Sequence, residues 1–405
     1  MPTDDEQQGS KIDYWNHGFI RNPYPAYKEA RESDPVYRFP MPNGQYAWIV
    51  TRYDDAVEVL NDARLVTNPP YLSDTDRPVG PPHQEIISRN LLSVNPSDHR
   101  RLRRLIQKAF TPRTIERLRG RIQQIADELL DRVQNKGAMN LIEDFAFPLP
   151  IIVICEMLGV PIEDQDRFRE WSNTIMEGVN DPRFAQQSEE VMIAFVDYLK
   201  ELIASRRQDL KEDLISDLIA VEDEGDVLSE QELYALVFVL IIAGHETTVN
   251  LIGNGVLALL EHPDQKEKLL GRPELILPAI EEILRYNGPA EVSNVRWATE
   301  DVEIRGKRIR KGEMLFVSFS SANRDPEQFP EPDSLDITRE ANQHIAFGKG
   351  VHYCLGAPLA RLEGEIALGT LLRRMPNIRL SATVNDLEWR AGMIIRGVKE
   401  IPVTF

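Results

Sequence analysis

Hydrophobic residues recur at helical spacing along most of the chain. One clear run follows Thr111, where apolar positions repeat every three or four residues along one face. These positions are Ile115, Leu118, Ile122, Ile125, Leu129 and Val133. Thr111 can cap a helix here, and Pro112 suits its first turn. The pattern predicts one long amphipathic helix that begins at Pro112.

A second and more apolar pattern begins at Ser229. Ser229 and Glu232 have the spacing of a capping box, and no further proline occurs before Pro263. A helix of about 33 residues would be roughly 50 Å long at 1.5 Å per residue. Because it is apolar around much of its circumference, we expect it to cross the interior of the protein.

Strand patterns are short and few. They occur in "VRWAT" near Val295, in "MLFVSF" near Met314 and in the C-terminal "EIPVTF". No repeat, low-complexity tract or linker-like stretch divides the chain. We therefore predict one domain over residues 1–405, mainly α with a minor β portion.

Composition and charge narrow the functional classes. Hydrophobic residues make up 42% and charged residues 28% of the chain, as in ordinary globular proteins. Uninterrupted apolar runs of about ten residues fall short of the roughly 18 that a membrane span needs. The N-terminus is polar and acidic with no apolar signal core, so a cytoplasmic location is predicted. The net charge of −18 argues against nucleic-acid binding.

One stretch runs against this acidic balance. Residues 100–121 contain nine Arg or Lys residues and a single acid, Glu116. This is typical of a solvated helical face, and a docking patch for an acidic partner is the alternative.

The two cysteines of the chain have different surroundings. Cys155 lies in the apolar run "IIVICEML" and is expected to be a small buried residue. Cys354 lies in a glycine-spaced loop before a predicted helix, "APLARLEGEIALGTLLRR", in whose first turn Pro358 is tolerable. A helix N-terminus favours the thiolate, and one thiolate suits a single axial ligand to a large flat cofactor. A buried structural cysteine is the alternative; a cysteine nucleophile lacks a nearby His–Asn or His–Asp arrangement.

The loop around Cys354 resembles the haem-binding loop of the cytochromes P450, the haem-thiolate monooxygenases. The residues that carry the resemblance are Phe347, Gly348, Gly350, His352, Cys354 and Gly356. Three further motifs match: Glu282 and Arg285 in "AIEEILRY", the segment "AGHETT" from Ala243 to Thr248, and "HRRLR" with His99 and Arg103. The motifs occur in the family's order and span essentially the whole chain.

The resemblance implies a cytochrome P450 fold, with haem b between the long central helix and the cysteine-loop helix. Cys354 would be the axial thiolate, which passes electron density to the iron and favours O–O cleavage. The loop backbone would tune the sulfur, and Phe347 would shield it from water. The Glu282–Arg285 pair would be buried beneath the haem and would clamp the segment that leads to the loop.

The resemblance also gives roles to the centre of the long helix. Ala243 would lie against the haem, and Gly244 would leave room for a diatomic ligand. Thr247 would orient dioxygen and Glu246 would pass protons inward, although a polar break on a buried helix is the alternative. His245 points about 100° away from each neighbour and is not assigned a catalytic role.

The haem carboxylates need cationic or donor partners. The resemblance assigns this task to His99, Arg103, Arg296 and His352. His344 lies near the loop without a role.

The substrate pocket is predicted from three apolar segments. Its lining residues would be Val239, Ile242, Ala243, Val292, Ser293, Ile394 and Ile395. The whole-chain pattern most resembles the branch that hydroxylates macrolides and other polyketides, so a sizeable apolar substrate is expected; steroids, terpenoids and fatty acids remain open. Residues 65–91 and 168–205 would form the lid.

Electrons must come from another protein. Two cysteines exclude a resident iron–sulfur cluster, which usually takes four thiolates. An acidic ferredoxin with its reductase is therefore the predicted partner, alongside O₂ and a small hydrophobic substrate. A peroxide-using peroxygenase and a non-enzymatic haem protein that binds a gas are the alternatives. The Glu246–Thr247 pair favours neither, because neither needs a proton relay.

Overall fold

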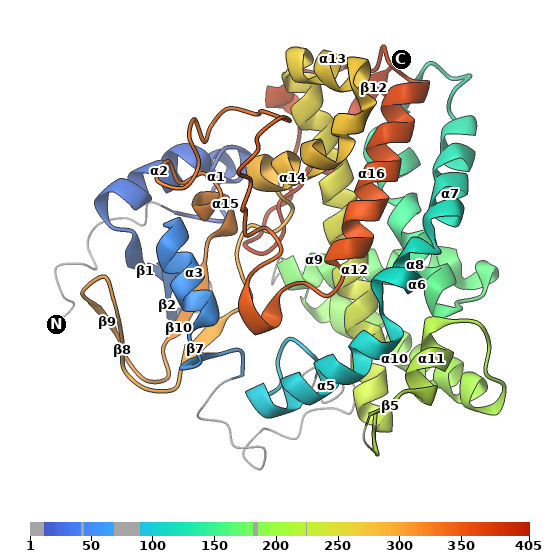
Figure 1. Ribbon diagram of the computed structural model, residues 1–405, viewed down its shortest axis with the longest axis horizontal. Helices are drawn as coiled ribbons and strands as arrows, with labels where there is room; N and C mark the ends of the chain where they lie inside the picture. Colours follow the sequence, from blue (N-terminus) through green and yellow to red (C-terminus); the bar gives the residue numbers. More distant parts are fainter. Residues whose placement is uncertain (1–11, 42–43, 69–89, 181–184, 224) are drawn as a thin grey trace.

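The helix predicted to begin at Ser229 runs through the middle of the structure as α12 (Glu230–Glu261) (Figure 1). Both hydrogen bonds of the predicted capping box are present, between Ser229 and Glu232. Helices α8, α10, α14 and α16 pack around α12 and bury most of its side chains. The predicted central helix is therefore confirmed.

The computed structural model of the protein describes residues 12–41, 44–68, 90–180, 185–223 and 225–405. The helices in these ranges are α1 (His17–Arg21), α2 (Tyr24–Ser33), α3 (Tyr53–Asn61), α5 (Pro96–Ala109), α6 (Pro112–Glu116), α7 (Arg119–Asp131), α8 (Pro148–Leu158), α9 (Gln165–Asn180), α10 (Ala185–Gln208), α11 (Leu214–Ala220), α12, α13 (Pro263–Gly271), α14 (Ile276–Asn287), α15 (Phe319–Ala322) and α16 (Ala357–Arg374).

The strands are short and belong to small sheets. They are β1 (Val36–Pro40), β2 (Tyr46–Val50), β3 (Leu65–Val66), β4 (Ala138–Asn140), β5 (Glu222–Asp223), β6 (Asp226–Val227), β7 (Arg296–Ala298), β8 (Val302–Ile304), β9 (Lys307–Ile309), β10 (Met314–Val317), β11 (Arg379–Leu380) and β12 (Pro402–Thr404). The largest sheet has the order β1-β2-β10-β7-β3, and β11-β12-β4 form a second. The predicted strands near Val295, near Met314 and at the C-terminus are β7, β10 and β12.

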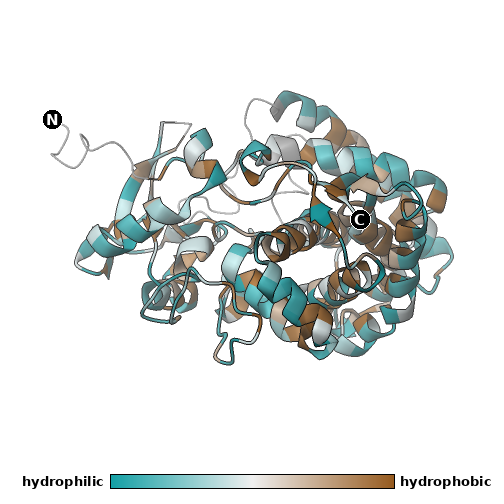
Figure 2. Ribbon diagram, turned by 90° about the horizontal axis from the view of Figure 1, so that it is seen from above, coloured by the Kyte–Doolittle hydropathy of each residue, from teal (hydrophilic) through white to brown (hydrophobic). Residues whose placement is uncertain are grey.

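The architecture has a helical part and a smaller part that carries the main sheet (Figure 1). The largest hydrophobic cluster fills the helical part around α12, where apolar ribbon segments gather inside more polar surroundings (Figure 2). Two smaller clusters lie around the sheet. The mainly α fold with a minor β portion is thus confirmed.

Two predictions about elements need correction. The helix expected from Pro112 is two helices, α6 and α7, although Thr111 does cap the first. The Leu118 N–H donates to Ile115 O rather than to the carbonyl four residues back, which tightens the turn between them. Because the apolar face continues across this turn, hydrophobic spacing cannot reveal it. The β1–β2 hairpin is the second difference, since its strands went unpredicted.

The central helix bears on the sequence argument that the apolar runs are too short for a membrane span. Among the described helices, α12 is the one whose length and hydropathy would suit a membrane span. However, 72% of its most apolar window is buried inside the protein, as in the core helix of a folded domain. The uninterrupted apolar runs are short because polar residues such as Asn250 and Asn254 interrupt them, but these residues are buried too.

Near the C-terminus, a short antiparallel segment packs against α12. The Arg390 N–H donates to Gly397 O at 2.9 Å, and Trp389 pairs with Val398. A Cβ on Gly397 would lie 1.6 Å from Asn250 Oδ1, so the segment has no room for a side chain there. We call residues 388–399 the C-terminal hairpin.

Gly397→Ala should therefore force the C-terminal hairpin away from α12. We expect a destabilisation of about 1–3 kcal/mol, as in other overpacked contacts, measured from the midpoint of urea unfolding. Gly271→Ala is the control, since nothing lies within 4 Å of a Cβ at Gly271. Equal midpoints for the two variants would show that the hairpin is not seated on Asn250.

Candidate functional site

The loop before α16 has the shape that its glycines predict. Gly348 and Gly350 have φ angles of 71° and 72°, in the left-handed region that favours glycine. The Cys354 N–H donates to Phe347 O at 2.9 Å and closes the loop. Gly356 differs from the expectation: its φ of −78° is ordinary, and it is the residue that precedes the first turn of α16.

Opposing effects act on the Cys354 thiol. Cys354 is an exposed residue, but protein atoms crowd its sulfur, and this desolvation raises its pKa. Backbone N–H groups of Gly356 and Ala357 and the charge of Arg103 lower the pKa. The net direction is upward, so the helix terminus by itself does not make this cysteine a thiolate. Coordination to a metal would do so, because it deprotonates a thiol outright.

Four basic side chains gather near this loop. His99 and Arg103 come from α5, Arg296 from β7 and His352 from the loop. The His99 and His352 rings pack with centroids 4.1 Å apart. All four residues predicted to face the haem carboxylates thus lie in one neighbourhood, although their positions span more than half of the sequence.

The electrostatics of this cluster favour a bound anion. Burial and nearby Arg103 and Arg296 lower the pKa of His99 to about 4. Burial, Arg296, His99 and Arg103 lower that of His352 to about 3. Burial lowers the pKa of Arg296 to about 10. The charges acting on both imidazoles are positive, so a negative group between them would be stabilised.

Unpartnered donors support the same conclusion. Arg296 Nε and His352 Nδ1 are buried and have no hydrogen-bond partner among the described residues. Arg296 donates through Nη1 to Leu65 O at 3.2 Å, and Arg103 donates to Tyr353 O at 2.8 Å. Donors and cations beside one cysteine sulfur fit a cofactor that presents both a metal and carboxylates. The residues present therefore fit haem.

The centre of α12 exposes a short stretch of an otherwise buried helix. Ala243 and Gly244 are exposed, and Thr247 is half-buried. A Cβ on Gly244 would meet only Ile154, at an ordinary 3.9 Å. The Thr247 hydroxyl donates to Ala243 O at 2.8 Å, as expected for threonine within a helix, but α12 remains continuous.

Glu246 lies next to this stretch and is 1% exposed. Its Oε1 accepts a hydrogen bond from Asn250 Nδ2 at 3.3 Å and lies 3.4 Å from Arg390 Nε. Its Oε2 is buried and has no hydrogen-bond partner among the described residues. A buried carboxylate with one open oxygen can exchange protons with water.

His245 is placed differently from its neighbours. Its ring packs edge-on against Phe147, with centroids 4.4 Å apart, and Nδ1 lies 3.2 Å from Ser172 Oγ. Burial lowers its pKa to about 4, so it is neutral at physiological pH. These contacts lie within the core, which agrees with assigning it no catalytic role.

The Glu282–Arg285 pair on α14 is fully buried. Two hydrogen bonds of 2.7 Å join the carboxylate to the guanidinium, and both side chains are 0% exposed. Arg285 also donates to the carbonyls of Asn323, Pro332 and Ser334. The pair thus binds α14 to the chain that leads toward the cysteine loop.

Glu282 has further partners that the sequence motif did not include. Arg339 lies 3.2 Å away, and Asn342 Nδ2 donates to Glu282 at 3.0 Å. The Asp336 N–H donates to the same carboxylate at 2.9 Å. All three of these further partners of Glu282 lie in the segment between β10 and Cys354.

A second network lies beside the loop. Arg361 on α16 makes two hydrogen bonds to Glu281, of 2.6 and 2.8 Å, and its guanidinium lies over the Phe347 ring. His344 Nε2 lies 3.1 Å from Glu281. His344, which had no role, therefore belongs to the support of the loop.

The predicted pocket residues fall into two groups. Ala243 and Ile394 are exposed and Ile242 is half-buried, so they are available to a ligand. Val239, Val292, Ser293 and Ile395 are buried in the protein. The Ser293 hydroxyl accepts from the Val317 N–H and donates to Asn294 O, so it is engaged within the fold.

Part of the predicted lid lies among the residues that the structure describes. Of residues 65–91, positions 69–89 lie outside the described residues. Most of 168–205 forms α9 and α10, which pack against each other and against α12.

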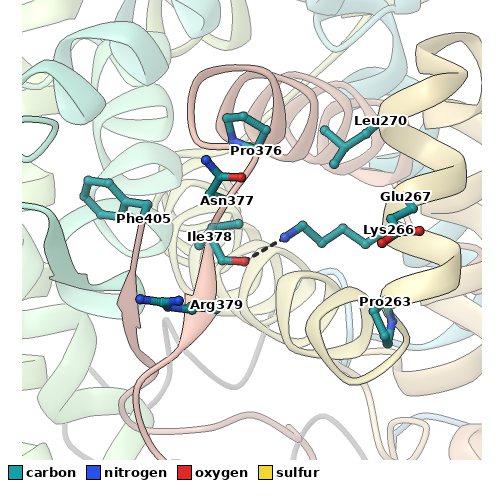
Figure 3. A pocket seen from close by; sticks show the side chains of 9 residues that line it. All are labelled: Pro263, Lys266, Glu267, Leu270, Pro376, Asn377, Ile378, Arg379 and Phe405. Carbon is teal, nitrogen blue, oxygen red and sulfur yellow. Dashed lines mark hydrogen bonds between the residues drawn. The ribbon is translucent and has the colours of Figure 1, made fainter.

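A separate surface hollow lies between α13 and the chain after α16 (Figure 3). It has a volume of about 650 Å³, and Lys266 Nζ donates to Ile378 O at 2.7 Å beside it. It is lined by Pro263, Lys266, Glu267, Leu270, Pro376, Asn377, Ile378, Arg379 and Phe405. None of these is a predicted site residue, so the hollow is not part of the candidate site.

The basic stretch from 100 to 121 divides into two sets. Arg101, Arg119 and Arg121 form ion pairs with acidic side chains. Arg100, Arg104, Lys108, Arg113 and Arg117 are exposed. The exposed cations lie on α5 and α6 and directly after α6, and among them Lys108 Nζ donates to Glu222 O at 2.9 Å.

Arg390 is a site residue that sequence reasoning missed. It meets Glu246 across 144 positions, and nothing local marks either residue as the other's partner. Arg339 and Arg361 were missed for the same reason, although each lies close in sequence to a recognised motif.

Comparison with known proteins agrees with this geometry. The family model described as Cytochrome P450 matches residues 15–271 and 274–378. The Bacillus subtilis protein named polyketide biosynthesis cytochrome P450 PksS is 42% identical over 97% of this chain and 99% of its own. Its solved structure has a TM-score of 0.92, with the same coverage of both chains.

Two further relatives are similarly close. Mycinamicin IV hydroxylase/epoxidase from Micromonospora griseorubida is 44% identical over 94% of each chain. Vitamin D(3) 25-hydroxylase from Pseudonocardia autotrophica is 42% identical over 97% of this chain and 96% of its own. With the cysteine loop, the cation cluster and the central helix in place, these matches show that the chain belongs to the cytochrome P450 family of haem-thiolate monooxygenases.

Proposed function

We propose that this monooxygenase inserts one oxygen atom from O₂ into a C–H bond of a sizeable apolar molecule, with haem b held by Cys354. The observation that carries the proposal is a cysteine loop with four basic residues beside it. Arg296 and His352 have buried nitrogen atoms without a hydrogen-bond partner among the described residues, and burial and positive neighbours lower the pKa values of His99 and His352. His99, Arg103, Arg296 and His352 would hold the haem carboxylates.

The haem, when bound, supplies the activation of dioxygen, and the protein supplies position and protons. The N–H groups of Gly356 and Ala357 stabilise negative charge on the Cys354 sulfur. The buried Glu282–Arg285 pair and the Glu281–Arg361 pair keep the loop from shifting.

Proton delivery falls to α12. Glu246 gives a proton inward, and the Thr247 hydroxyl receives and orients it beside the open space at Gly244. Thr247 donates its own hydrogen to Ala243 O, which leaves its oxygen lone pairs free to accept from a proton donor. Gly244 keeps this space clear, since among the described residues outside its own helix turn a Cβ there would meet Ile154 at 3.9 Å.

A polyketide-like substrate is the best-supported class. One relative is named for polyketide biosynthesis, and another acts on mycinamicin IV, as its name states. A third is named for vitamin D(3), which is also a large molecule with few polar groups. Exposed Ala243 and Ile394 and half-buried Ile242 would meet such a substrate through apolar surface.

The electron donor in this proposal is an acidic ferredoxin, in the cytoplasm. Arg103 joins the basic helix α5 to the cysteine loop through Tyr353 O. Val351 and Tyr353, beside Cys354, are 63% and 39% exposed. An apolar centre with the exposed cations of α5 and α6 nearby suits a small acidic protein on an otherwise acidic surface.

Cys354→Ala should abolish the absorption band that carbon monoxide gives with reduced, thiolate-ligated haem. The reason is that no second thiolate faces the site, since Cys155 is buried in α8. Cys155→Ala is the matched control and should keep the band. A normal band in Cys354→Ala would remove the axial assignment.

Thr247→Ala should uncouple the enzyme. Oxygen and reductant should still be consumed, but most of the electrons should be recovered as hydrogen peroxide rather than product. Thr248→Ala is the matched control, because Thr248 also donates to a helix carbonyl, that of Gly244, but is buried. Glu246→Gln should instead slow turnover by on the order of 100-fold, the lower range for loss of a positioned proton donor. Wild-type product yield per electron in Thr247→Ala, with wild-type turnover in Glu246→Gln, would contradict the relay.

Charge reversal at Arg104 and Lys108 should slow reduction by ferredoxin. Long-range attraction acts mainly on association, and it fades with salt because the Debye length is roughly 8 Å at physiological ionic strength. Substrate binding and reduction by dithionite should be unchanged. Reversal at Arg132 and Lys136, two exposed cations beyond this stretch, is the control with equal charge change. Equal ferredoxin rates for both double variants at low salt would show that α5 does not dock the donor.

A further inference from the structure

The buried carboxylate of Glu246 has an unusual partner. Arg390 comes from the C-terminal hairpin, and its Nε lies 3.4 Å from Glu246 Oε1. The carboxylate is 1% exposed, whereas the Arg390 side chain is 21% exposed. The arginine therefore extends from the surface of the protein to an acid inside it.

The backbone around this pair fixes its position. The Arg390 N–H donates to Gly397 O, and Gly397 packs directly on Asn250 of α12. Asn250 in turn donates to both Glu246 O and Glu246 Oε1. The hairpin, Asn250 and Glu246 are thus in continuous contact.

Several polar atoms in this contact make no hydrogen bond to the described residues. Glu246 Oε2, Asn250 Oδ1 and Arg390 Nε are all buried without a hydrogen bond among the described residues. Buried polar atoms of this kind are the ones that ordered water satisfies. Ordered water at these atoms would complete the hydrogen bonding around Glu246.

We propose that Arg390 positions Glu246 and marks the place where solvent protons enter the relay. The inference rests on the proposed proton transfer by Glu246. Glu246, a carboxylate beside Arg390, takes a proton from water on the hairpin side and then gives it inward toward Thr247, which restores the carboxylate that Arg390 stabilises. One O–H bond breaks and one forms at Glu246, and the guanidinium keeps its own protons.

A double-variant cycle tests the pairing without relying on turnover. Arg390→Gln leaves a buried carboxylate without its cation, so the unfolding midpoint of the haem-loaded protein should fall by a few degrees. Adding Glu246→Gln to that variant should recover part of the loss, because the unpaired charge is then gone. Lys399→Gln is the control, since it removes a cation from the same hairpin whose partner is the exposed Glu388.

Proton entry is tested by the solvent isotope effect on product formation. In Arg390→Gln, turnover should fall by on the order of tenfold and the effect of deuterated water should increase, because reprotonation of Glu246 becomes slower. Arg390→Lys should restore most of the rate. Lys399→Gln should match the wild-type enzyme in both measurements.

The outcomes separate this inference from the proposal beneath it. No recovery of stability in the double variant, or an unchanged isotope effect in Arg390→Gln, would overturn the role of Arg390. Wild-type turnover in Glu246→Gln would instead overturn the relay itself, even if the stability cycle showed that the two residues are paired.

Discussion

The fold depends on one ion pair that has no access to water. Glu282 and Arg285 lie one turn apart on α14, and neither side chain is exposed. A buried pair of this kind is costly unless its remaining donors and acceptors are satisfied. Here they are satisfied by the backbone between Asn323 and Asp336 and by Arg339 and Asn342. A long segment without helices or strands is thereby attached to α14.

That segment leads directly into the cysteine loop, so the buried ion pair also helps to position the loop. Its own glycines and the Cys354 N–H bond define its local shape, while Glu281, Arg361 and His344 secure its side. A loop that carries one ligand must be rigid, because a single bond cannot orient it. Two carboxylates adjacent in sequence, Glu281 and Glu282, face different partners and share this task.

Much of this architecture could be predicted from the sequence. The central helix, its capping box and the strands β7, β10 and β12 follow from local spacing and composition. The break between α6 and α7 could not be predicted, because a tightened turn leaves the apolar face in phase. The β1–β2 hairpin was missed because β1 contains Arg38 and ends in Pro40, and a proline within a run weakens a strand pattern.

The candidate site divides in the same way. The cysteine loop, the Glu282–Arg285 pair and the acid and hydroxyl of α12 are local motifs, so they can be found in the sequence alone. Whether a pocket residue is open or buried depends on tertiary contacts, so Ser293 and Ile394 could not be distinguished by sequence. Partners such as Arg390 are equally hidden, since charge pairing over such separations leaves no local pattern.

The close packing of Gly397 on Asn250 also has a consequence for how the protein folds as it is synthesised. During synthesis, α12 leaves the ribosome well before the C-terminal hairpin. The helices around α12 can therefore pack while the surface around Glu246 is still uncovered. When residues 388–399 have been made, they cover that face of α12, and the absence of a side chain at Gly397 lets them pack directly on Asn250. The packing around Glu246 can therefore be completed only after this segment has been synthesised.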